Sequence, residues 1–153
     1  MTVATTLTAL AAVLSTITSP AAPAAVYANP REATSIGELP VIILTESATT
    51  THTWTPLSFQ KGGQVWNHQW SADLFLLVGP RGAGLPDLHG RLLGWPESIT
   101  RALGADLTLG STIESLGHDN GQVWQYRIGP QQWGDQQFFG LRGQIAVTEF
   151  IQP

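Results

Sequence analysis

Apolar residues near the N-terminus recur at spacings of three and four positions. Such spacing places them in one stripe along an α-helix, made up of Val3, Leu7, Leu10, Ala11, Leu14 and Ile17. Pro20 and Pro23 then end the helix, because proline lacks a backbone N–H and disfavours helix in the residue before it. The pattern predicts an amphipathic docking helix over residues 1–18, followed by an Ala/Pro-rich linker over residues 19–37.

A secretion signal is the second interpretation of this segment. Residues 7–25 combine an apolar run with small residues that resemble a cleavage site. A signal peptide also needs a positive charge before the apolar run, whereas the first Lys or Arg of the chain is Arg31. The run is also interrupted by polar residues, namely Thr8, Ser15, Thr16 and Thr18. The docking helix is therefore the preferred interpretation.

The next elements show strand patterns. Val41–Leu44 is a continuous β-type apolar run, which predicts a short strand buried on both faces. Residues 50–79 predict a long hairpin with its turn at residues 60–63. In its second arm one face carries Trp66, His68, Trp70, Ala72, Leu74 and Leu76, and the other carries Val65, Asn67, Gln69, Ser71 and Asp73. Since only residues 75–78 are apolar on both faces, we expect the tip to project beyond the core.

The second half of the chain predicts two short helices and three strands. Pro86 and Pro96 suit helix first turns, giving helices near residues 86–93 and 96–103, with Gly104 at the C′ position of the second. Residues 108–117, 122–129 and 138–150 have strand patterns, and residues 118–121 (His-Asp-Asn-Gly) predict a β-turn. We therefore expect one α+β domain over residues 1–153. Its core, residues 38–153, has helices on one face of a mixed, mostly antiparallel sheet.

Composition narrows the class of protein. Charged residues make up 12% of the chain and the net charge is −4. This charged share is about half the usual one, and it favours a subunit that packs against neighbours. There is no basic stripe, so we expect no sequence-specific nucleic-acid binding. There is no apolar run long enough to span a membrane, and no cysteine for disulfides or thiolate metal sites.

The sequence carries no recognisable catalytic motif. The four histidines (His52, His68, His89 and His118) lack metal-ligand spacing. His52 and His68 could face each other across the hairpin, but no acidic residue is near them in sequence. Residues 79–84 lack the order of a phosphate-binding loop, and no serine lies in a G-x-S-x-G motif. We expect no enzymatic activity, no bound metal and no cofactor.

Six tryptophans are many for a chain of this length. Trp95 and Trp124 are predicted to lie in the core. The others are predicted at protein–protein contacts, where tryptophan is enriched because it buries a large area at a small cost in entropy. The candidate assembly interface therefore consists of Trp54, Lys61, Trp66, His68, Trp70 and Trp133. A platform on which tryptophans stack against sugar rings stays open as the alternative.

Several segments resemble one family. Val26–Pro30 and Glu38–Ile43 follow the first predicted helix, Ala102–Ile113 follows the last, and the chain ends in the strand Phe139–Glu149. In this order they resemble the tail terminator (tail-to-head joining) proteins of long-tailed bacteriophages. The resemblance implies a structural virion protein of the tail neck, assembled in the host cytoplasm. It also implies a homohexameric ring that contacts the tail tube protein and the head–tail connector protein. Another neck or tail-completion protein, or a secreted carbohydrate-binding module, is the alternative.

Overall fold

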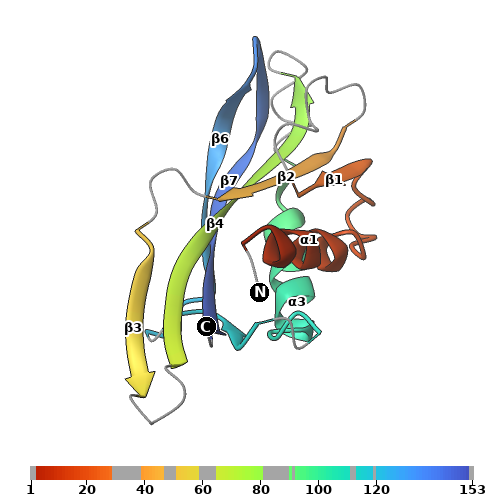
Figure 1. Ribbon diagram of the computed structural model, residues 1–153. Helices are drawn as coiled ribbons and strands as arrows, with labels where there is room; N and C mark the ends of the chain where they lie inside the picture. Colours follow the sequence, from red (N-terminus) through yellow and green to blue (C-terminus); the bar gives the residue numbers. More distant parts are fainter. Residues whose placement is uncertain are drawn as a thin grey trace.

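Two long strands form the middle of the sheet in the computed structural model, which describes residues 3–28, 39–46, 51–58, 65–80, 90, 92–110, 113–118 and 120–151. Strand β4 (Val65–Pro80) pairs antiparallel with β7 (Gln136–Ile151) from Trp66 to Pro80. Figure 1 shows the two strands side by side along the whole sheet. The other described strands attach to one or the other of this pair, except β1, which pairs with β2.

The remaining strands complete a mixed, seven-stranded sheet. On one side of the central pair, β2 (Val41–Glu46) and β3 (Thr53–Ser58) both pair antiparallel with β4, and β1 (Ala25–Tyr27) pairs parallel with β2. On the other side, β5 (Ser115–Leu116) and β6 (Trp124–Trp133) pair antiparallel with β7. The expected α+β class and the mostly antiparallel sheet are confirmed.

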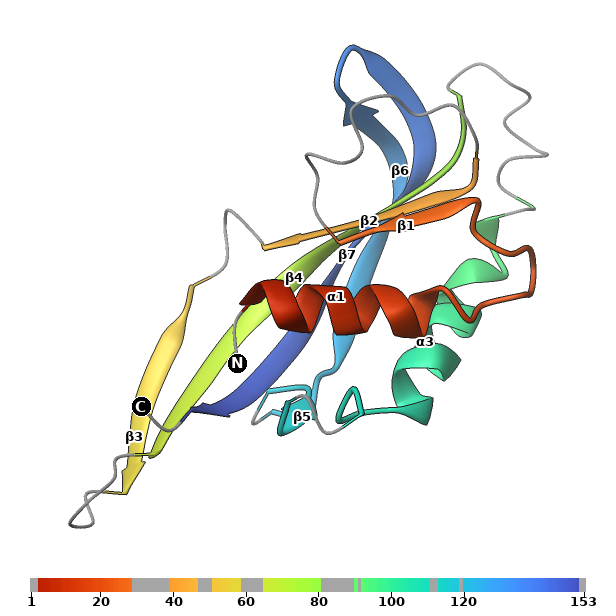
Figure 2. The same ribbon diagram turned by 45° about the vertical axis from the view of Figure 1, so that its right-hand side comes forward.

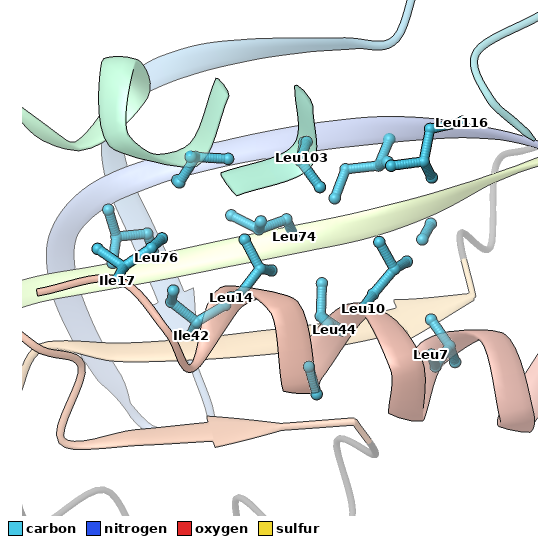
Figure 3. Close-up of a cluster of buried hydrophobic side chains, with 14 of the residues drawn as sticks. Leu7, Leu10, Leu14, Ile17, Ile42, Leu44, Leu74, Leu76, Leu103 and Leu116 are labelled. Carbon is cyan, nitrogen blue, oxygen red and sulfur yellow. The ribbon is translucent and has the colours of Figure 1, made fainter. Parts of the chain in front are cut away.

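Both described helices cover the same face of this sheet. Helix α1 (Val3–Leu14) and helix α3 (Trp95–Ala105) lie next to each other in front of the strands in Figure 2. The predicted N-terminal stripe is buried: Leu7, Leu10, Ala11 and Leu14 lie on the inner side of α1, and Ile17 lies just after it. Figure 3 shows Leu7, Leu10, Leu14 and Ile17 facing the sheet residues Ile42, Leu44, Leu74 and Leu76.

Strand β2 is buried on both faces, as its unbroken apolar run predicts. Ile42 and Leu44 belong to the main core under the helices. Val41 and Ile43 belong to a second cluster, together with Leu77 and Phe138. Because successive side chains of a strand point to opposite faces, this second cluster lies on the side of the sheet away from the helices.

Three predicted boundaries are wrong. The linker predicted over residues 19–37 contains strand β1. Just before this strand, the Ala24 N–H donates to the Pro40 carbonyl at 2.7 Å. Gly104 lies inside the last turn of α3, which ends at Ala105. Among the described residues of 108–117, only Ser115 and Leu116 form a strand, and the chain turns at Leu109, which has a φ of 50°. The helix predicted near residues 86–93 lies mostly outside the described residues.

Glycine is required where β4 changes register against β7. The shift lies between Leu77 and Gly79, opposite Gly140 of β7. A Cβ atom on Gly140 would lie only 1.8 Å from the Leu76 carbonyl oxygen. Any side chain at this position would therefore force the two central strands apart.

The burial of α1 generates a prediction for Leu14, which is 0% exposed. Leu14→Asp should lower the free energy of unfolding by at least about 3 kcal/mol, because it places an unpaired charge in the core. Urea denaturation followed by circular dichroism measures the loss. Ala12→Asp adds the same charge to the exposed side of α1 and is the matched control. Equal unfolding midpoints for the two variants would contradict the docking of this helix.

Candidate functional site

One end of the sheet extends past the first turn of α1, as Figure 2 shows for β3 and β4. Of the described strands, only β3, β4 and β7 form the sheet there. Directly opposite residues share a face, and the register gives two rows on the face that carries the helices. The inner row is Trp54, His68 and Glu149, and the outer row is Pro56, Trp66 and Ile151.

A chain of polar contacts runs through the inner row. His68 Nδ1 lies 3.1 Å from Glu149 Oε2, and His68 Nε2 lies 2.8 Å from His52 Nδ1. Thr6 of α1 donates its hydroxyl to Glu149 Oε1 at 2.6 Å. His52 Nε2 in turn lies 2.6 Å from Glu46 Oε1 of β2, at an angle that is poor for a hydrogen bond. We call Glu46, His52, His68, Glu149 and Thr6 the histidine–glutamate chain.

The expectation that the two histidines lack an acidic partner is therefore wrong. His52 and His68 do face each other across β3 and β4, as the hairpin pattern suggests, but two carboxylates bracket them. Glu149 lies 81 residues after His68 in the sequence. Pairing between β4 and β7 brings the two together, so no local motif could reveal the contact.

The protonation of His68 follows from its surroundings. His68 is 2% exposed and Glu149 1% exposed. Burial lowers the pKa of His68 below its ordinary value of 6.5, and this effect outweighs the hydrogen bond and the charge of Glu149, which raise it. Neutral His68 donates its Nδ1–H to the carboxylate and leaves Nε2 free to accept the Nδ1–H of His52. The half-exposed Glu46 lies beside the other ring nitrogen of His52, Nε2.

Two aromatic rings enclose the chain. The indole of Trp54 stacks on the imidazole of His68 with the ring centroids 3.9 Å apart and the planes 8° apart. The ring of Trp70 lies 6.0 Å from that of His52, nearly parallel to it. The polar contacts are therefore shielded from water on two sides, which strengthens each of them.

The outer row forms a partly exposed apolar surface. Trp54 is 48% exposed although its ring is held against His68. Pro56, Trp66 and Ile151 are each partly exposed beside it. We call Trp54, Pro56, Trp66 and Ile151 the aromatic patch.

The structure separates the residues of the candidate interface. Trp54 and Trp66 lie together in the aromatic patch. Two assignments are wrong: Trp70 is 0% exposed in the main core, and His68 is buried in the histidine–glutamate chain. Trp133 lies at the other end of β7, packed edge-on against Phe75 at 5.4 Å. Lys61 lies outside the described residues.

The predicted core tryptophans also differ from each other. Trp95 is 1% exposed and lies in the main core, as predicted. Trp124 is only partly buried at the margin of this core, and its Nε1–H donates to the Thr100 hydroxyl of α3 at 3.0 Å. The predicted turn at residues 118–121 is confirmed by the Gly121 N–H, which donates to the His118 carbonyl at 2.8 Å.

Sequence reasoning missed Glu46, Glu149 and Thr6. A signal for Glu149 exists in the alternation of β7, where it follows the inward-facing Ile145 and Val147 at spacings of two. A carboxylate at such a position must find a partner inside the protein. Thr6 carries a similar signal, because it adjoins Leu7 on the buried side of α1.

Other chemistry is sparse in the described part of the chain. Its His, Asp and Glu side chains form no group of three that could hold a metal ion. A shallow hollow of about 440 Å³ lies over β6 and β7, lined by Gln125, Tyr126, Arg127, Gln131, Arg142, Gly143 and Gln144. Neither described helix is long and apolar enough to cross a membrane. The sequence matches no protein-family model and no curated protein.

The burial of His68 predicts a pH-dependent stability. Because the pKa of His68 is lower in the folded protein than in the unfolded chain, the unfolded chain binds more protons below pH 6.5. The contribution of His68 is complete above pH 6.5 and is lost as the pH falls through 6.5 toward the folded pKa, with a slope of at most about 1.4 kcal/mol per pH unit. His68→Gln should reduce this loss in urea denaturation between pH 7.5 and 5.

His118→Gln is the control for this measurement. His118 contacts the Trp70 carbonyl at 2.8 Å and lies outside the histidine–glutamate chain. This variant should keep the pH dependence of the unmodified protein. If His68→Gln and His118→Gln lose stability equally steeply, His68 does not govern the response.

Proposed function

We propose that this chain is a structural assembly subunit whose aromatic patch binds another protein surface. The observation that carries the proposal is the exposure of Trp54 beside Trp66 at the end of the sheet that no described helix covers. A buried tryptophan contributes about 2–3 kcal/mol to a contact. Stacking on His68 already holds the Trp54 ring in place, so binding costs less side-chain entropy.

A protein surface suits the patch better than a sugar. Sugar-binding sites need polar groups directed at the ligand beside the aromatic ring. Around Trp54 the nearby polar groups of His68, Glu149 and Thr6 are buried and bonded to one another. The hollow over β6 and β7 offers amide and guanidinium groups, but no tryptophan lines it. The apolar character of Pro56 and Ile151 in the patch supports a protein contact.

The finer proposal follows the resemblance of the sequence segments described above. In it the chain forms a homohexameric ring that caps the tail tube of a long-tailed bacteriophage and joins it to the head connector. The same proposal includes three finer features of the fold. These are a long projecting hairpin formed by β3 and β4, a single domain over the whole chain, and a third helix. A heterologous contact closes into a ring only if the rotation between subunits divides the circle, which a sixfold ring on a sixfold tube satisfies. The low share of charged residues supports a subunit with extensive contacts.

The combined change Trp54→Ser and Trp66→Ser tests the proposal. Both side chains are partly exposed, so the variant should fold with a thermal midpoint close to that of the unmodified protein. It should no longer form rings in negative-stain electron microscopy or join tails in an assembly assay. The unmodified protein should do both. Trp70 is left unchanged because its removal would open a cavity in the core.

Trp133→Ser is the matched control, since it removes a partly buried tryptophan at the opposite end of β7. It should keep ring formation. Normal rings from the Trp54/Trp66 variant would show that the patch is not the contact surface. An unmodified protein that forms no ring, alone or on tail tubes, would contradict the proposed function itself.

A further inference from the structure

The described strands leave one side of β6 without a hydrogen-bonded neighbour. Ala146 N–H donates to the Val123 carbonyl at 2.7 Å, and Trp124 lies opposite Ile145 of β7. The odd-numbered residues of β6 therefore direct their backbone groups toward β7, and the even-numbered residues direct theirs away from it. Among the described strands none pairs with this outer side of β6.

The even-numbered residues also present exposed apolar side chains. Tyr126 is 44% exposed and Ile128 38% exposed. Tyr126 stacks on Trp124 with a ring distance of 4.8 Å, and the hydrogen bond to Thr100 fixes Trp124 in turn. The ring of Trp124 lies over Gly143, where a Cβ atom would come within 3.2 Å of it. The row Trp124, Tyr126 and Ile128 is thus already ordered before any partner binds.

The other edges of the described sheet carry protection along a short length, whereas β6 leaves the stretch Trp124–Ile128 without it. Proteins block exposed edges with proline, with lysine or with very short strands. The outer edge of β3 contains Pro56, and β1 has only three residues. In β6 the proline stands at position 130, so the stretch Trp124–Ile128 keeps its full set of outward N–H and C=O groups.

We propose that β6 pairs with β6 of a second copy of this chain, antiparallel and across a two-fold axis. Tyr126 then lies opposite Tyr126 of the other copy, and Trp124 lies opposite Ile128. Within Trp124–Ile128, the three residues whose backbone groups point outward all exchange backbone hydrogen bonds with the other copy in this register. Pro130, which has no N–H, falls just beyond the paired stretch. The two sheets become one continuous sheet.

The polar face of β6 supports a second copy as the occupant. Arg127 lies directly opposite Arg142 across β6 and β7, and like charges in such positions repel. Arg142 is paired with Asp73 at 3.0 Å, whereas no described carboxylate lies within ion-pair distance of Arg127. In the proposed register Gln125 of one copy lies opposite Arg127 of the other. The amide oxygen of Gln125 can then accept a hydrogen bond from the unpaired guanidinium of Arg127.

The same residues disfavour a neighbouring register. A shift that moves Tyr126 opposite Ile128 places Arg127 opposite Arg127 of the other copy. It also places Trp124 opposite Pro130, where one hydrogen bond is lost. The sequence of β6 therefore disfavours this shifted alignment with itself.

Sedimentation equilibrium over a wide range of protein concentration tests the proposal. It is performed on the unmodified protein and on the Trp54→Ser/Trp66→Ser variant, so that ring formation through the aromatic patch cannot mask the result. A reversible dimer is expected in the Trp54→Ser/Trp66→Ser protein. Adding Tyr126→Pro should abolish the dimer, because it removes an outward N–H without breaking a bond to β7. Adding Gln132→Pro, which removes an outward N–H beyond the paired stretch, should leave it intact.

Two charge variants keep the test decisive if Tyr126→Pro fails to fold. Gln125→Glu places a carboxylate opposite Arg127 twice per dimer, and should tighten dimerisation about fivefold. Gln125→Lys should weaken it by a similar factor. A protein that stays monomeric throughout, or a dimer equally strong in Gln125→Glu and Gln125→Lys, would overturn the proposal. Capture of an unrelated peptide by a monomeric protein would overturn it as well.

Discussion

The pairing of β4 with β7 is the constraint on which the other parts of this structure depend. The register places Trp66 opposite Ile151 at one end of the pair and Pro80 opposite Phe138 at the other. Every other strand borders one of these two directly, except β1, which reaches β4 through β2. The helices pack on the face that this pairing creates. A one-residue change in the register of either strand would exchange the apolar and polar faces of that strand.

The histidine–glutamate chain marks the place where the covered part of that face ends. Above it, Leu10 and Leu14 of α1 seal the sheet with apolar contacts. On the other side of the histidine–glutamate chain, the same face continues as the aromatic patch, which no described helix covers. A buried carboxylate is costly unless it is bonded, and Glu149 meets this requirement through Thr6 and His68. The first turn of α1 is thereby attached to the strands at the border between core and surface.

Local periodicity predicts the elements whose burial depends on their own apolar residues. Helix α1, strand β2 and the inner face of β4 belong to this group, and so does the core position of Trp95. The prediction fails where distant segments decide the environment. Trp70 lies next to polar Ser71 and Gln69 in sequence, yet it is completely buried in the main core, opposite Val147 of β7. His68 meets Glu149 only through strand pairing. The hollow and the open edge of β6 likewise depend on which strands lie beside β7, and periodicity carries no information on strand order.

The place of β7 in the chain has a consequence for how the protein is made. Strand β4 is synthesised more than fifty residues before the strand that borders it, since β4 ends at Pro80 and β7 begins at Gln136. Proteins dominated by such distant pairings fold slowly, because the loop must close before the contacts form. During translation the apolar stretch Phe75–Val78 emerges with one side of its backbone unpaired, which is a known hazard for aggregation. The delay between these two strands, rather than the stability of the finished sheet, therefore sets the period in which a nascent chain needs protection.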